Sequence, residues 1–306
     1  MNTVSETLKS KLLGVRTAID KNIIGQEQML PELIKNIERG ELGLADSKRP
    51  KGSFLFLGPT GVGKTELTLT FTEYLFDEDC MYRFDMSEFR HIDSIKQFIG
   101  DETGSHGRLG RVLENNKHGT LLFDEMEKAH PQIMDIFLQI LDAARVTLGN
   151  GKTYNLSNYY IVFTSNIGAK RIPDKGTVLS TILESGIKAE VKKHLRKEMI
   201  ARFGDICIFQ QLDYNTQKDI AKLILGKELQ RMDEKGYHLT CSSSAFHYMI
   251  INGIQEGLGV RPLRDTIQKS IGDAICDEIL RGGNNPNGEL IHDKDDNCLK
   301  INQKND

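Results

Sequence analysis

The sequence of 306 residues contains no tryptophan, only seven prolines, and five cysteines that never form a C-x-x-C pair. Because the cysteines are scattered and their number is odd, a disulfide framework or a zinc site is not expected, and a reducing compartment is favoured. No apolar run approaches the ~18 residues of a membrane span, and the polar N-terminal segment has no signal-peptide core. We therefore expect a cytoplasmic protein with no metal site built from cysteine and no membrane span.

A surplus of either charge is also missing. Forty basic residues against 43 acidic ones give a net charge of -3, so the broad positive field of a non-specific nucleic-acid binder is absent. The hydrophobic share of 39% and the charged share of 27% are typical of a globular chain and argue against a disordered one. At ~150 residues per domain, the length predicts about two domains.

Short, continuously apolar segments alternate with helical spacing in the first two thirds of the chain. Such runs are typical of strands covered on both faces, and they occupy residues 53–57, 81–84, 120–123 and 159–164. Helical spacing occurs over residues 5–20, 26–40, 66–76, 94–99 and 133–141. Strands that alternate with helices predict an α/β fold, a parallel sheet sandwiched by helices.

After about residue 211 the buried-strand pattern stops. Amphipathic spacing predicts helices over residues 216–233, 243–252 and 263–280, and a weak hairpin pattern covers residues 289–301. Earlier in the chain, Asn150-Gly151 is a two-residue hairpin signal. We expect a large αβα domain over residues 1–210 and a small, mainly helical domain with a terminal strand pair over residues 211–306.

One glycine-rich segment points to phosphate chemistry. Residues 58–65 read G-P-T-G-V-G-K-T, which fits G-x-x-x-x-G-K-[ST] between a predicted strand and a predicted helix. Glycines let backbone N–H groups point at phosphate oxygens, and a helix N-terminus attracts anions. In such a loop Lys64 reaches the β- and γ-phosphates and Thr65 offers its hydroxyl to Mg²⁺. The alternative is a glycine-rich turn without a ligand.

Polar residues end two further predicted strands. Asp124 and Glu125 follow the strand at 120–123, where Asp124 would hold the Mg²⁺ shell and Glu125 would polarise the attacking water. This requires their strand to lie beside the strand of the phosphate loop, with its carboxyl end at the ligand crevice. Asn166 follows the strand at 159–164 and would orient the water. The alternatives are a solvated acidic loop and a turn-forming asparagine.

The chain resembles the C-terminal ATPase module of Clp-type unfoldases and disaggregases, within the AAA+ superfamily. The resemblance extends from about residue 5 to residue 301. The segments that carry it are I-I-G-Q-E-Q (23–28), G-S-F-L-F-L-G-P-T-G-V-G-K-T-E-L (52–67), D-M-S-E-F (85–89), L-L-F-D-E-M-E-K-A-H-P (121–131), T-S-N-I-G (164–168) and G-V-R-P-L-R (259–264).

The resemblance implies a role for each matching residue. Asn166 matches the sensor-1 residue, Arg202 the arginine finger that reaches the neighbouring subunit's nucleotide, and Arg261 the sensor-2 arginine. It implies that ATP contacts Ile23, Ile24, Gly58, Pro59, Thr60, Gly61, Val62, Gly63, Lys64, Thr65, Glu66 and Arg261. It further implies Mg²⁺ on Thr65 and Asp124, and a homo-oligomeric ring, a hexamer, that acts on a protein partner. No nucleic acid is expected as a partner.

The sequence departs from the family where relatives grip a polypeptide. The loop after Ile99-Gly100 is shorter than in relatives, and no Phe, Tyr or Trp occurs between Phe98 and Phe123. The Asn150-Gly151 hairpin fits a second pore loop, in which we expect Tyr154 to pack across the strands. No preceding ATPase module, recruiting domain or coiled-coil insertion is recognised, nor is a tripeptide for docking a protease ring.

We therefore expect an ATP-hydrolysing ring that remodels or regulates a protein partner without processive threading. Two alternatives stay open. One is a nucleotide-switched assembly or scaffold module, in which binding rather than turnover matters. The other is a nucleic-acid-dependent loader or helicase, which the near-neutral charge and the absence of tryptophan disfavour.

Overall fold

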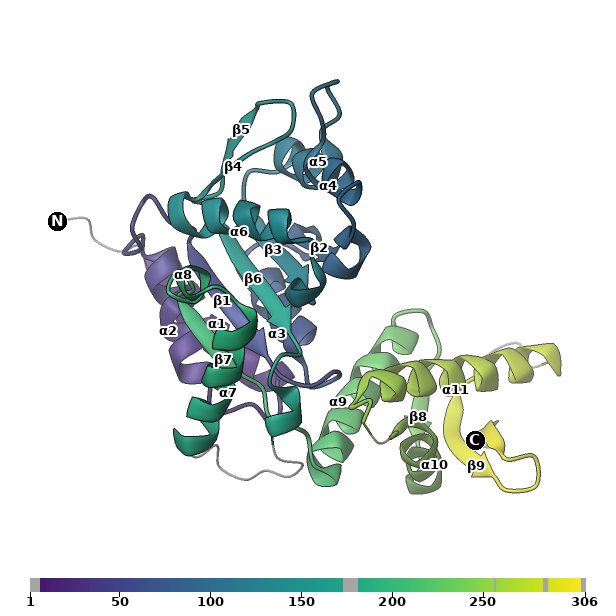
Figure 1. Cartoon of the computed structure of the whole chain (residues 1–306). Coiled ribbons are helices and arrows are strands. Elements are labelled where there is room, and N and C mark those ends of the chain that lie inside the picture. The colour runs from purple at the N-terminus through teal and green to yellow at the C-terminus, as the bar shows by residue number, and fades with distance from the viewer. Residues whose placement is uncertain (1–5, 173–180, 256, 283–285, 304–306) are drawn as a thin grey trace. The chain divides into compact units, whose positions relative to one another are not determined.

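The computed structural model describes residues 6–172, 181–255, 257–282 and 286–303. The chain divides into two compact units, whose helices and strands are labelled in Figure 1. The first unit runs to Pro59 and resumes over Gly63–Gln211. The second joins Thr60–Val62 to the residues from Leu212 onward.

A parallel sheet forms the centre of the first unit. Its five strands lie in the order β2-β3-β6-β1-β7, and all neighbouring pairs are parallel. The strands are β1 (Gly52–Leu57), β2 (Met81–Asp85), β3 (Gly119–Asp124), β6 (Tyr159–Ser165) and β7 (Asp205–Ile208). Every residue of β1, β3 and β6 is buried, as expected when helices cover both faces. The predicted α/β class and four predicted strands are confirmed, and β7 is an addition.

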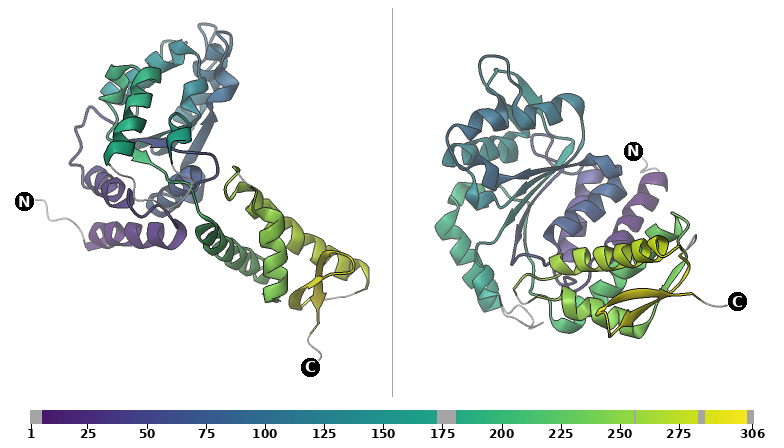
Figure 2. Two further views of the ribbon diagram at one scale, coloured as in Figure 1. Left: turned by 60° about the horizontal axis from the view of Figure 1, so that its bottom comes forward. Right: turned by 90° about the vertical axis from the view of Figure 1, so that its right-hand side faces the viewer.

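Helices cover both faces of this sheet (Figure 2). Phe71 of α3 packs on Phe54 of β1, whereas Phe137 of α6 packs on Phe123 of β3. The helices of the unit are α1 (Glu6–Asn22), α2 (Leu30–Glu41), α3 (Lys64–Leu75), α4 (Ser94–Ile99), α5 (Gly107–Asn115), α6 (Pro131–Ala143), α7 (Thr181–His194) and α8 (Lys197–Ile200). Four short 3-10 turns are η1 (Glu78–Cys80), η2 (Met86–Phe89), η3 (Met126–Lys128) and η4 (Ala169–Arg171). Among these helices, α5, α7 and α8 were not predicted.

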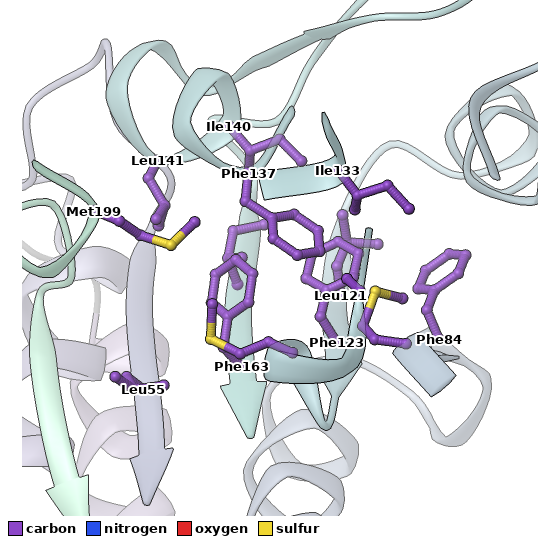
Figure 3. Close-up of a cluster of buried hydrophobic side chains, with 14 of the residues drawn as sticks. Leu55, Phe84, Leu121, Phe123, Ile133, Phe137, Ile140, Leu141, Phe163 and Met199 are labelled. Carbon is purple, nitrogen blue, oxygen red and sulfur yellow. The ribbon is translucent and has the colours of Figure 1, made fainter. Parts of the chain in front are cut away.

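Three buried aromatic rings join β3, β6 and α6 (Figure 3). The ring centroids are 4.7 Å apart for Phe123 and Phe137, 4.9 Å for Phe137 and Phe163, and 5.2 Å for Phe123 and Phe163. Such pairs contribute about 0.5–1.5 kcal/mol each beyond the burial of their area. The cluster fixes β3 and β6 beside each other and therefore fixes the polar residues that follow these strands.

A small hairpin projects from this unit. Its strands β4 (Arg145–Thr147) and β5 (Thr153–Asn155) are antiparallel, and Val146 lies opposite Tyr154. The Leu148 N–H donates to Lys152 O over 2.9 Å, and Gly151 has a φ of +79°. The turn is therefore a three-residue loop with a left-handed glycine, and the predicted two-residue turn is wrong.

The second unit is mainly helical. It contains α9 (Tyr214–Asp233), β8 (Leu239–Cys241), α10 (Ser243–Gly253), α11 (Arg261–Leu280), β9 (Gly288–Asp293) and β10 (Cys298–Asn302). The predicted helices and the terminal strand pair are confirmed, and β8 adds a third strand parallel to β9. Asp213 and Ser242 cap α9 and α10 by accepting from backbone N–H groups over 2.7 and 3.2 Å. Within the described ranges, no helix is long and apolar enough to span a bilayer.

Candidate functional site

The loop between β1 and α3 has a backbone that only glycine adopts readily. Gly61 and Gly63 have φ values of +76° and +102°, and Gly63 directly precedes α3. A Cβ on Gly58 would lie 2.8 Å from Cβ of Phe209. Left-handed backbone and close packing both exclude larger residues. The loop therefore leads into the N-terminus of α3, and the N-terminus of a helix suits an anion.

Lys64 is the first residue of α3, and its side chain reaches back to the start of the glycine loop. Its Nζ donates to Gly58 O over 2.5 Å, to Pro59 O over 2.9 Å and to Asn166 Oδ1 over 3.1 Å. The residue is only 9% exposed. The ammonium group is thus held by backbone carbonyls at the end of β1 and by the residue that follows β6.

Asn166 connects this lysine to Glu125. While its Oδ1 accepts from Lys64, its Nδ2 donates to Glu125 Oε1 over 3.2 Å. Its backbone N–H donates to Glu127 Oε1 over 3.1 Å. A continuous hydrogen-bonded chain therefore runs from the ammonium group through the amide to the carboxylate, with the asparagine in the middle.

The sheet order explains the place of Asn166 and corrects one expectation. The strand of Asp124 and Glu125 was expected beside β1, but β6 lies between β3 and β1. Spacing along the sequence does not fix which parallel strands are neighbours, because each crossover can span one strand or more. The intervening β6 brings Asn166 to the centre of the site.

Glu125 has an unusual backbone for a residue with a side chain. Its φ and ψ of 55° and 50° are left-handed, a conformation that costs about 1–2 kcal/mol outside glycine. Its N–H donates to Thr164 Oγ1 over 2.9 Å. Its carboxylate also forms an ion pair with Lys128. Strained backbone conformations of this kind are common at functional sites, where they fix the direction of a side chain.

Asp124 is buried and its two carboxylate oxygens are both engaged. Thr164 Oγ1 donates to Oδ1, while Arg83 Nε and Nη2 donate to Oδ2 over 3.1 and 2.5 Å. Asp85 lies in register with it on β2, and the Ser87 side chain, by hydrogen bonding, lowers the pKa of the Asp85 carboxyl. The guanidinium of Arg83 is therefore hydrogen-bonded to Asp124, and its charge adds to the lowering of the Asp85 pKa.

Sequence reasoning missed Arg83, Thr164 and Lys128. Each lies within or beside a segment that was noticed, but none falls in a motif that singles it out. Arg83 carried the clearest signal, since a charged residue stands one position before the end of the apolar run at residues 81–84.

The oxygen donors of the site suit Mg²⁺. The hydroxyl of Thr65 and the carboxylate of Asp124 are hard ligands, and Mg²⁺ keeps several waters and phosphate oxygens in addition to one or two protein ligands. Among the residues that the structure describes, no group of three His, Cys, Asp or Glu side chains forms a closed metal cage. The residues present therefore fit a Mg²⁺ ion that shares its ligands with a phosphate chain.

The segment of Ile23 and Ile24 lies between α1 and α2. Ile23 is buried and Ile24 is half-buried. Two hydrogen bonds join this segment to the second residue after β7: Gln26 Nε2 donates to Gln210 O over 3.0 Å, and the Gln210 N–H donates to Gln26 Oε1 over 2.9 Å. Gln26 is a further residue whose structural role the sequence did not reveal.

The structure does not bring Arg202 to this cluster. Ser53, at the start of β1, donates through Oγ to Arg202 O over 3.5 Å, whereas the glycine loop follows the end of β1. Gly58 is five positions after Ser53 along the extended chain, which is about 17 Å at ~3.3 Å per residue. Arg202 therefore lies at the opposite end of β1 from the loop of its own chain. Arg261 belongs to the second unit, where it begins α11 with an exposed side chain.

Two family models match the chain. Residues 49–206 match the AAA domain of the Cdc48 subfamily, and residues 212–292 match the C-terminal, D2-small domain of ClpB protein. The first match alone covers about half of the chain.

Known proteins with similar sequences and structures agree with these matches. The chaperone protein ClpB of Vibrio vulnificus is 37% identical over 295 residues, which is 93% of this chain and 34% of that protein. The ATP-binding subunit ClpC of the ATP-dependent Clp protease of Staphylococcus epidermidis is 33% identical over 311 residues, 96% of this chain and 38% of that protein. A closed-state reconstruction of Hsp104 with ATPγS and FITC casein has a TM-score of 0.85 at 30% identity, over 98% of this chain and 53% of that chain. The chain thus spans about a third of the length of these curated relatives.

Proposed function

Because this chain belongs to the Clp-type AAA+ ATPases, we propose that it hydrolyses Mg²⁺-bound ATP as part of a ring of six copies. Residues 1–210 would be the large ATPase domain and residues 211–306 its small domain. The observation that carries the proposal is the hydrogen-bonded chain from Lys64 through Asn166 to Glu125. It supports the proposal because a cation, an amide and a carboxylate are hydrogen-bonded in series beside the glycine loop.

Each of these residues has a chemical task at a triphosphate. Lys64 contacts the β- and γ-phosphates, and the N–H groups of residues 60–65 bind their oxygens. Thr65 and Asp124 would hold Mg²⁺, which would neutralise charge on the phosphates. Glu125 accepts a hydrogen bond from the attacking water and aims it, while Asn166 keeps that carboxylate facing the γ-phosphate. Ile23 and Ile24 contact the adenine, and Arg261 contacts the phosphates from the small domain.

Arg202 acts on the nucleotide of the neighbouring subunit. Its place at the far end of β1 puts it about 17 Å along the strand from its own loop, which supports a role in trans. A guanidinium that meets the γ-phosphate stabilises the charge of the transition state, which accelerates hydrolysis by about 10³–10⁵ in studied cases. Turnover would then depend on assembly.

The partner is a protein that is remodelled without processive threading, in the cytoplasm and without nucleic acid. The loop after α4 supports this view, because it carries no Phe, Tyr or Trp side chain and folds back on itself. The Asp101 N–H donates to Ser105 O over 3.2 Å, and the Thr103 N–H donates to Asp101 Oδ1 over 3.0 Å. A closed polar loop lacks the flat apolar surface with which aromatic side chains hold a polypeptide.

The test compares the wild-type chain with Glu125→Gln. We expect the variant to bind ATP as tightly as the wild type and to lose turnover, since an amide cannot accept the proton of the water. Fluorescent-nucleotide titration and phosphate release measure the two properties. Equal turnover in both proteins would refute the proposal, and a partner assay unaffected by the variant would favour a nucleotide switch. Unfolding of a tagged, folded reporter protein would refute the absence of threading.

A further inference from the structure

Helix α6 carries two aspartates seven residues apart, and each holds an arginine beside α8. The Asp135 Oδ1 lies 2.6 Å from Arg196 Nη1, and Arg196 directly precedes α8. Arg202 follows the end of α8 and donates through Nη1 to Asp142 Oδ1. The two ion pairs therefore bracket α8 against one helix.

Other contacts fix the backbone of Arg202. Met199 of α8 is 2% exposed and belongs to the same buried cluster as Leu141 of α6, and Figure 3 shows both side chains. The Arg202 N–H donates to Met199 O over 3.0 Å, and Arg202 O accepts from Ser53 Oγ. Since packing and backbone hydrogen bonds hold this segment, Asp142 determines where the guanidinium points rather than where its backbone lies.

We propose that Asp142 is a positioning residue that retains the Arg202 guanidinium on its own subunit until a neighbouring nucleotide draws it away. This inference rests on the proposed role of Arg202 in trans. The Arg202 and Asp142 side chains are 31% and 50% exposed, so their ion pair belongs to the weak, solvent-screened class. A triphosphate carries more negative charge than one carboxylate and accepts from the planar fork of a guanidinium. The triphosphate of a neighbouring subunit therefore outcompetes Asp142 for the guanidinium. Asp142 keeps its ion pair with Arg202 only while no neighbouring subunit presents a nucleotide.

The test measures ATPase activity per subunit against protein concentration for Asp142→Asn. This variant preserves the shape of the side chain and removes its charge. We expect half-maximal activity at a protein concentration up to about fivefold lower than in the wild type, the range that a surface ion pair can account for. Asp142→Glu should restore the wild-type concentration. The matched control is Asp135→Asn, which removes the partner of Arg196 and is expected to leave the concentration unchanged.

A second background separates positioning from structure. In Arg202→Ala the guanidinium is gone, so adding Asp142→Asn should not change the assembly mass measured with a non-hydrolysable ATP analogue. A change in that background, or an Asp142→Asn variant that needs as much protein as the wild type or more, would overturn the proposal. If Arg202→Ala alone retained full turnover, the role in trans would fail instead, so the two failures are distinguishable.

Discussion

Asn166 offers the sharpest perturbation of the site, because it holds Lys64 with one atom and Glu125 with the other. Replacing it with alanine removes the donor 3.2 Å from Glu125 Oε1, and we expect kcat to fall by about 10²-fold, the usual effect of losing one preorganised donor. Nucleotide affinity should change little, because Lys64 keeps its bonds to the Gly58 and Pro59 carbonyls in the free loop.

Asn166→Asp tests the direction of these bonds. An aspartate still accepts from Lys64 but cannot donate to Glu125. Two carboxylates about 3.2 Å apart repel each other by about 5 kcal/mol at an effective dielectric constant of 20, so one of them takes up a proton or turns away. We therefore expect Asn166→Asp to be no more active than Asn166→Ala.

Steady-state phosphate release and fluorescent-nucleotide titration distinguish the outcomes. A suitable control is Asn155→Ala, which removes an asparagine whose Oδ1 accepts from the Ser157 N–H over 2.7 Å in the exposed hairpin. This control should hydrolyse ATP at the wild-type rate. Wild-type activity in Asn166→Asp would refute the assigned donor and acceptor roles, and a large loss of nucleotide affinity in Asn166→Ala would show that the asparagine serves binding rather than turnover.

Three further outcomes are expected. Lys64→Ala should weaken nucleotide binding severely, as titration would show, because Lys64 is the cation held at the loop; unchanged affinity would contradict this. Arg202→Ala should bind ATP without turnover and, mixed with wild type, should reduce activity non-linearly; linear dilution would argue against a residue acting in trans. Burial raises the pKa of the Asp205 carboxyl in the folded chain. Its ionisation therefore lowers the free energy of unfolding as the pH rises from the unfolded-state pKa of about 3.9 through the higher folded-state pKa. Asp205→Asn should therefore raise the unfolding free energy at pH 7, with a gain that vanishes near pH 3 in urea titrations; an equal gain at both pH values would contradict the cause.

The fold class follows from the sequence because the central strands leave a strong pattern. Residues 53–57, 120–123 and 159–164 are continuously apolar, and the strands found there extend the prediction by only one or two residues. The strand β7 was missed, since it has only four residues and begins with the charged Asp205 at an edge of the sheet. Likewise, α8 has only four residues, which is too short for helical periodicity to register.

The residues of the candidate site that belong to a sequence motif were predicted. The residues that reach the site only because the sheet brings distant segments together were missed. The glycine loop, Asp124 and Glu125 all follow strands and could be named from spacing. Arg83 meets Asp124 because β2 and β3 are neighbours in register, which is a property of the sheet rather than of either segment. The strand order was misjudged for the same reason, since the spacing of crossovers does not specify which strand lies between two others.

The central claim is that ATP is cleaved between two copies of this chain. The most direct measurement is the ATPase rate per subunit over a wide dilution series, with the mass of the assembly determined in ATP at each concentration. The rate per subunit is expected to fall steeply at the dilution where the mass drops to that of a single chain. A single chain that retains the full rate would contradict the claim.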